Sequence, residues 1–204
     1  MTLPVIARRR FLLMLSGAAT TLLLPGLALA AKKKAAVVRR PAAKAGKSKA
    51  VPRELRERRL SFFHMHTHES LETVYWADGW YLPDALAEVS WLLRDFRNDL
   101  QVDYDPQLLD LLHNIRRTFG SREPYLVVSG FRSPETNDAL RDAGRNVAGR
   151  SMHLEGKAID VRIPKVSVKR LNKLGLQLAA GGVGYYPRNG FVHLDTGRVR
   201  QWRG

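Results

Sequence analysis

The sequence predicts an α+β domain with a small antiparallel sheet and flanking helices. Helical patterns dominate the first half of the domain, short strand patterns dominate the second half, and no internal repeat or regular βαβ alternation is visible. The 204 residues are 45% hydrophobic and 26% charged, which is enough for one globular domain with an additional segment. The absence of cysteine excludes disulfide scaffolds, thiol nucleophiles and cysteine-ligated metals.

The elements can be predicted in order from residue 60. Strand-like runs on either side of a Glu69-Ser70 turn predict a hairpin of strands 60–67 and 71–76. Apolar residues at helical spacing, with proline or a capping residue at the start, predict helices at 83–98, 106–119, 134–146 and 168–180. Short apolar or alternating runs predict the remaining strands at 125–128, 157–163, 183–186 and 191–195.

Charge is concentrated at the start of the chain. Residues 1–60 hold 15 Lys/Arg and 2 Asp/Glu, whereas residues 61–204 hold 19 and 17. The net charge of +15 therefore describes a tail and not the folded domain. We expect no nucleic-acid partner.

Residues 1–30 have the pattern of a secretory signal. Arg8-Arg9-Arg10 precedes an apolar run, and Ala28-Leu29-Ala30 is an A-x-A cleavage pattern. The order Arg-Arg-x-Phe-Leu is similar to a twin-arginine signal, which predicts export of the folded protein to the periplasm. An ordinary Sec signal and an uncleaved membrane anchor are the alternatives.

Residues 31–59 predict a basic, disordered linker, because they combine Ala, Lys and Pro without apolar periodicity. The linker is either a solvated spacer or a segment that contacts an anionic membrane or cell-wall polymer electrostatically. The folded domain then covers residues 60–204, and we expect it to be a monomer.

Polar residues occur inside two apolar strands. In strand 157–163, alternation puts Asp160 on the face opposite the isoleucine and valine side chains. In strand 191–195, it puts His193 and Asp195 opposite valine and leucine. Together with His153, two imidazoles and a carboxylate suit zinc and leave a fourth position for water, as in catalytic sites. On spacing alone, a satisfied buried His–Asp pair is the alternative.

The string Ser151-x-His153-x-x-Gly156-x-Ala158-x-Asp160, followed by His193-x-Asp195, resembles the zinc D-Ala-D-Ala carboxypeptidase-like peptidases, which include the hedgehog zinc domain. Segments 129–133 and 181–187 are similar to the narrower murein endopeptidase K group, and the resemblance covers residues 60–202. It implies a zinc-dependent endopeptidase that cleaves peptide cross-links of peptidoglycan during cell-wall growth. The alternatives are a D,D-carboxypeptidase and a non-catalytic peptidoglycan-binding module with the same fold.

The resemblance also implies roles for individual residues. One Zn²⁺ per chain would be held by His153, Asp160 and His193. Arg132 would face the cleft and bind a substrate carboxylate or the developing oxyanion, although an ion pair at a helix start is its alternative. Ser151 would either orient the His153 loop or contact substrate. Apart from the resemblance, Tyr186 is expected to bind substrate as a cleft wall, with core packing as its alternative.

The general base is the least determined role. Many members of the resembled family place a carboxylate three residues before the third ligand, where this chain has Gly190. Asp195 is the best replacement, either as the catalytic proton acceptor or as a residue that only orients a ligand. A third assignment makes Asp195 the ligand and His193 the acid or base.

Three further histidines follow one another at period two: His64, His66 and His68. They form either a second metal-binding cluster on one face of a strand or simply the exposed face of a strand near the hairpin turn. We expect the exposed face, with the option that His66 lines the cleft.

Overall fold

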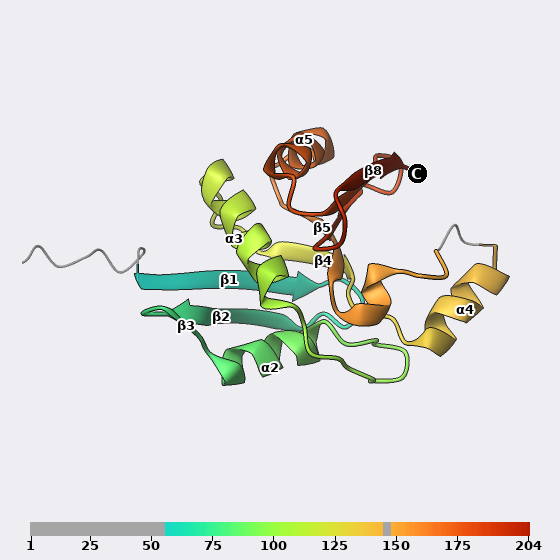
Figure 1. Cartoon of the computed structure of the whole chain (residues 1–204), viewed down its shortest axis with the longest axis horizontal. Coiled ribbons are helices and arrows are strands. Elements are labelled where there is room, and N and C mark those ends of the chain that lie inside the picture. The colour runs from blue at the N-terminus through green and yellow to red at the C-terminus, as the bar shows by residue number, and fades with distance from the viewer. Residues whose placement is uncertain (1–55, 145–147) are drawn as a thin grey trace, which may run out of the picture. The chain divides into compact units, whose positions relative to one another are not determined.

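The computed structural model describes residues 56–144 and 148–204, which form an α+β domain (Figure 1). The expected signal, 1–30, and all but the last four residues of the expected linker, 31–59, lie outside the described residues. Within the described part of the chain, no helix is long and apolar enough to cross a membrane.

One eight-stranded sheet organises the domain, in the order β3-β2-β1-β4-β5-β7-β6-β8. The strands are β1 (Glu57–His64), β2 (Ser70–Ala77), β3 (Trp80–Tyr81), β4 (Tyr125–Ser129), β5 (Ala158–Arg162), β6 (Gly182–Tyr186), β7 (Phe191–Asp195) and β8 (Arg200–Arg203). Neighbours are antiparallel except β1 with β4 and β6 with β8, which are parallel. The predicted fold class is confirmed, but the sequence does not predict the two short edge strands β3 and β8.

Three of the helices pack against the sheet at separate places. The helices are α2 (Pro83–Leu92), α3 (Pro106–Phe119), α4 (Pro134–Asp142), the 3-10 helix η1 (Met152–Glu155) and α5 (Val168–Leu178). In Figure 1, α3 lies over β1, whereas α2 packs against β2; α5 packs against β6 and β7. Proline occupies the first turn of α2, α3 and α4, where its missing N–H costs no helical hydrogen bond.

Three helices end earlier than their sequence patterns predict: α5 by two residues, at Leu178, and α2 and α4 by more. Helix α2 ends at Leu92 instead of residue 98, because the chain turns to bury Asp95, whose Oδ2 accepts a 2.9 Å hydrogen bond from the N–H of Ser133. That bond ties the loop after α2 to the start of α4. Helix α4 ends at Asp142 instead of residue 146, shortly before Gly144, which has a left-handed φ of +72°.

The apolar core takes up one face of β5 and β7 and leaves the side chains of the other face for the site. Ile159 and Val161 of β5 and Val192 and Leu194 of β7 are all fully buried in the core. Because successive side chains of a strand point to opposite faces, the intervening residues of both strands face away from this core. Strands β5 and β7 pair with Asp160 directly opposite His193, so these two side chains are cross-strand neighbours.

His64, His66 and His68, near the hairpin turn, do not form a metal-binding cluster. His64 ends β1 and is fully buried, so its expected exposure is wrong, whereas His66 and His68 are exposed. His64 Nδ1 accepts hydrogen bonds from the N–H groups of His66 and Thr67 at 3.3 and 3.2 Å. The ring of His66 stacks on Phe96 and does not line the pocket described below.

Acidification is expected to destabilise the fold through His64. Burial lowers the pKa of His64 from 6.5 to about 4, so the unfolded chain takes up the proton first. The contribution of neutral His64 to the free energy of unfolding is complete above pH 6.5 and is lost as the pH falls to about 4, a loss of about 1 to 2 kcal/mol after solvent screening. Urea unfolding between pH 7 and 4 measures it. His64→Asn, whose amide oxygen replaces the Nδ1 acceptor, should flatten the pH dependence; equal slopes would contradict this prediction.

Candidate metal centre and active site

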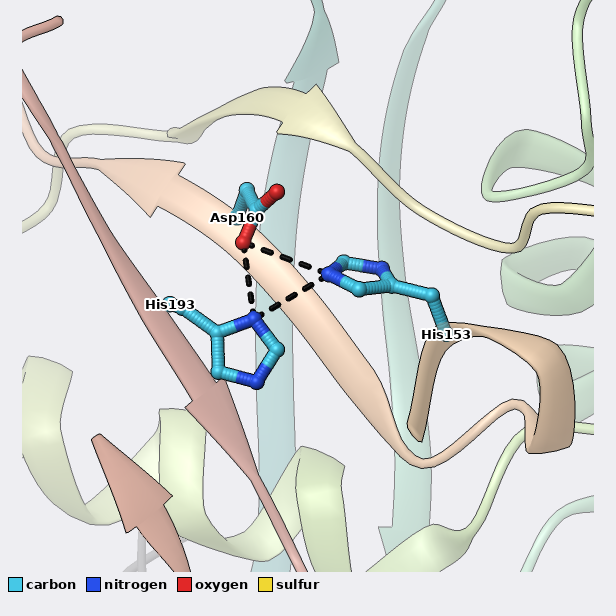
Figure 2. A group of neighbouring side chains, drawn as sticks. All are labelled: His153, Asp160 and His193. Atoms are coloured by element: carbon cyan, nitrogen blue, oxygen red, sulfur yellow. Dashed lines mark hydrogen bonds and ion pairs between the residues drawn. The ribbon is translucent and has the colours of Figure 1, made fainter. Parts of the chain in front are cut away.

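His153, Asp160 and His193 converge on one point (Figure 2). His153 comes from η1, Asp160 from β5 and His193 from β7. His153 Nε2 lies 3.1 Å from His193 Nδ1 and 3.3 Å from Asp160 Oδ1, and His193 Nδ1 lies 2.9 Å from the same Asp160 oxygen. In residues 56–144 and 148–204 this is the only group of three His, Cys, Asp or Glu side chains that is arranged to hold a metal ion.

The other nitrogen of each imidazole is already engaged. His153 Nδ1 lies 2.6 Å from the carbonyl oxygen of Gly130, which can only accept a hydrogen bond. His193 Nε2 lies 2.9 Å from Asp195 Oδ2. As neutral rings, both histidines therefore point an unprotonated nitrogen at the Asp160 carboxylate, and three lone pairs meet. Such an arrangement needs a positive charge between them.

The spacing of these atoms fits a four-coordinate metal. Ligands about 2.0 Å from a tetrahedral ion lie about 3.3 Å from one another, and the three distances are 2.9, 3.1 and 3.3 Å. The donor set of two imidazoles and one carboxylate leaves one coordination position for water or substrate. The residues therefore fit the divalent ion that the sequence predicts.

The backbone around His153 is fixed by close contacts. Ser151 caps η1 by accepting from the N–H of His153, and Gly156 ends it with a φ of +65°. An added Cβ at Gly156 would lie 2.7 Å from the carbonyl oxygen of Asp103. Gly130, whose carbonyl oxygen receives the His153 ring, packs equally closely on the backbone of Leu93. Glycine is required at both positions because the backbones approach each other so closely.

Electrostatics make the centre attract positive charge. Burial opposes ionisation of Asp160, but the two histidines outweigh it and hold the pKa of the carboxyl well below its usual range. Burial also opposes charge on His193, yet hydrogen bonds to Asp160 and Asp195 raise its pKa above the ordinary value. Burial lowers the pKa of His153. A divalent cation at this point would supply positive charge beside the Asp160 carboxylate.

Asp195 lies on the far side of His193 from Asp160. Its fully buried carboxylate accepts from His193 Nε2, from the N–H groups of Gly182 and Gly197 and from both terminal nitrogens of Arg200. These five donors occupy both oxygens. Of the roles that the sequence leaves open for Asp195, this placement favours orienting His193 over accepting a proton from water or serving as a metal ligand.

An open pocket of about 400 Å³ lies over the three converging side chains. Arg132, Ser151 and Tyr186, the predicted substrate-binding residues, all line it. Arg132 donates to Ser151 Oγ at 3.1 Å, while its buried Nε has no partner among the described residues. The ring of Tyr186 stacks on Phe191 with ring centroids 4.5 Å apart, so this part of the pocket wall is aromatic.

The pocket-lining residues that sequence reasoning missed include Arg150, Arg200 and Trp202. Arg150 is exposed in the loop before η1, and Arg200 and Trp202 come from the unpredicted strand β8. The available signal was the Arg-x-Trp spacing, which places two residues on one face of a strand. Among the described residues that line the pocket, Asp160 has the sole carboxylate, whereas three residues are arginines.

An α+β fold that gathers two histidines and an aspartate at the floor of an open pocket is typical of hydrolytic metallopeptidases. Residues 53–202 match the family model described as "Peptidoglycan L,D-endopeptidase MepK", and the chain belongs to this family of M15 peptidases. The resemblance seen in the sequence motifs is thereby confirmed.

Curated relatives agree with this assignment. Peptidoglycan L,D-endopeptidase MepK of Escherichia coli (strain K12) is 39% identical over 147 residues, which cover 72% of this chain and 81% of the relative. A Haemophilus influenzae relative, whose name also contains peptidoglycan L,D-endopeptidase MepK, is 38% identical over 146 residues, 71% of this chain and 78% of the relative. No solved structure matches the chain significantly.

Proposed function

We propose that the protein is a zinc-dependent peptidoglycan endopeptidase that cleaves peptide cross-links during cell-wall growth, at an L,D bond as the names of its relatives state. The observation that carries the proposal is the convergence of His153, Asp160 and His193, with the outer nitrogens of both imidazoles engaged elsewhere. Zinc at this point would supply a Lewis acid beside the scissile amide.

The chain's own residues would bind and orient the substrate. Arg132 lines the pocket with Ser151 holding one of its terminal nitrogens, so its remaining donors are free for a substrate carboxylate or the developing oxyanion. Arg150 adds a second guanidinium with no ion pair among the described residues. Two uncompensated cations favour a substrate with free carboxylates, which peptidoglycan stems carry. Tyr186 and Phe191 would pack against the apolar part of the peptide.

One observation favours a non-catalytic peptidoglycan-binding module as the second candidate. Position 190 is glycine, and in the described part of the chain Asp160 is the sole carboxylate on the pocket wall. A base that is free to take a proton is therefore not evident. This candidate retains the fold, the metal and the substrate pocket without hydrolysis.

Intact sacculi distinguish the two candidates. We expect the purified protein to reduce the amount of cross-linked muropeptides. A chelator should abolish this effect until zinc is restored. Mass spectrometry of the released muropeptides identifies the lost dimer and thereby the bond. Removal of a terminal D-alanine without loss of cross-linked dimers would instead indicate a carboxypeptidase. Co-sedimentation with sacculi without any change in muropeptides would contradict the endopeptidase and support the binding module.

We further propose that the protein acts in the periplasm as a monomer. The twin-arginine-like pattern of residues 1–30 supports export, and the 31–59 segment, with its high density of Lys and Arg, supports electrostatic contact with an anionic membrane or wall. Cell fractionation of a strain expressing the full chain tests the location, and a cytoplasmic signal alone would contradict it.

A further inference from the structure

The C-terminal strand β8 contributes Arg200 and Trp202 to the pocket wall, and the function proposed above assigns no role to either residue. It adds to the sheet beside β6, with Gly184 opposite Trp202 in the register. Arg200 and Trp202 are two residues apart, so both point to the same face of the strand. This is the face that carries His193.

Arg200 binds the carboxylate of Asp195, which in turn is hydrogen-bonded to His193. Its two terminal nitrogens donate to the two oxygens of Asp195 at 3.1 and 2.7 Å, a bidentate pair that fixes the plane of the carboxylate. Asp195 is fully buried, so without Arg200 its charge would lose a bidentate ion pair. The plane of Asp195 sets the direction from which Oδ2 meets His193 Nε2 at 2.9 Å.

Trp202 restricts the position of the His193 imidazole by packing against it. Its ring centroid lies 5.0 Å from that of His193, and its Nε1 donates to the hydroxyl of Tyr186 at 2.9 Å. Position 184 is glycine where the indole passes, and a Cβ there would lie 2.6 Å from it. The Arg200 guanidinium lies 4.9 Å from the indole centroid, so the two β8 side chains also support each other.

We propose that Arg200 and Trp202 are positioning residues that hold the His193 ring with Nδ1 directed at His153 and Asp160. Arg200 acts through Asp195 by hydrogen bonding, and Trp202 acts directly on the ring by packing. Neither residue is among the three that would hold the metal. The proposal rests on the metal site proposed above, because an orientation of His193 matters only if Nδ1 is a ligand atom.

The test measures the metal and not only activity. The full chain, Arg200→Gln, Arg200→Lys and Trp202→Phe are titrated with Zn²⁺ in competition with a chromophoric chelator, and their Co²⁺ forms are compared by visible absorption. We expect Arg200→Gln to weaken zinc binding 10- to 100-fold, the range for residues that orient a metal ligand, and to change the Co²⁺ spectrum. Arg200→Lys should restore part of the affinity, because it keeps the charge but not the bidentate geometry.

The matched control is Arg198→Gln. Arg198 is exposed, and it contacts Arg200 through its backbone carbonyl. The substitution leaves this carbonyl in place. It should leave zinc affinity and the Co²⁺ spectrum unchanged. Trp202→Phe leaves the buried ion pair intact and provides the measurement if Arg200→Gln fails to fold; it should change the Co²⁺ spectrum and weaken zinc binding severalfold.

The outcomes separate this proposal from the function on which it rests. If the unmodified chain binds no stoichiometric zinc, the proposed metal site is wrong. If the unmodified chain binds zinc and both Trp202→Phe and the folded Arg200 variants retain its affinity and Co²⁺ spectrum, the metal site stands and the positioning role is overturned. A spectral change in Trp202→Phe with the control unchanged supports the role.

Discussion

Replacing His153 with alanine is expected to abolish both stoichiometric metal binding and peptidoglycan hydrolysis. The substitution removes one of three converging ligand atoms and leaves His193 and Asp160 as an incomplete site. A metal that contributes several kcal/mol to the transition state corresponds to a rate loss of more than about 10³-fold when it is absent. Metal content of the purified variant and muropeptide release from sacculi measure the two effects.

Arg132→Gln is the comparison that separates metal binding from substrate binding. Arg132 lines the same pocket but contacts Ser151 and none of the three ligand atoms, so this variant should keep stoichiometric metal while hydrolysis falls. Circular dichroism of both variants checks that the fold is retained. Stoichiometric zinc in folded His153→Ala would show that His153 is not a ligand. Loss of zinc in Arg132→Gln would show that the arginine supports the metal centre itself.

The convergence of Asp160 and His193 could be predicted from the sequence because it depends on a local property. Alternation along two short strands sends both side chains to the face that the apolar residues do not use. The structure adds the register, which sets Asp160 opposite His193. The tautomer of His193 could not be predicted, because it follows from the contact with Asp195, and the direction of that carboxylate depends on Arg200 of another strand.

Features that depend on distant contacts are the ones that the sequence does not predict. The apolar period of α2 continues to Phe96, yet the helix ends at Leu92 because Asp95 bonds to Ser133, 38 residues away. Strand β8 has four residues and no apolar alternation, and it exists as a strand because β6 offers an edge to pair with. His64 belongs to the same period-two run as two exposed histidines, and its burial comes from packing across the domain.

Replacing Gly181 with alanine is expected to lower the free energy of unfolding by about 3 kcal/mol. In the sequence, Gly181-Gly182 reads as the break that ends a helix, but α5 already ends at Leu178 with Ala179 as its C-cap. The structure shows another need for glycine. A Cβ at position 181 would lie 1.9 Å from the carbonyl oxygen and 2.7 Å from the carbonyl carbon of Asp195. Both atoms are backbone, so no side-chain rotation relieves the contact.

The displaced backbone belongs to the residue that holds His193, so the same substitution should also weaken metal binding. Gly149→Ala is the matched control, because the atom nearest to its added Cβ is the end of the flexible Arg141 side chain at 3.2 Å. Urea unfolding of the metal-free proteins measures stability, and chelator competition measures zinc affinity. Gly181→Ala with stability within about 0.5 kcal/mol of the unmodified chain would contradict the close approach. A destabilised Gly181→Ala that binds zinc with undiminished affinity would show that the metal centre does not depend on the position of the Asp195 backbone.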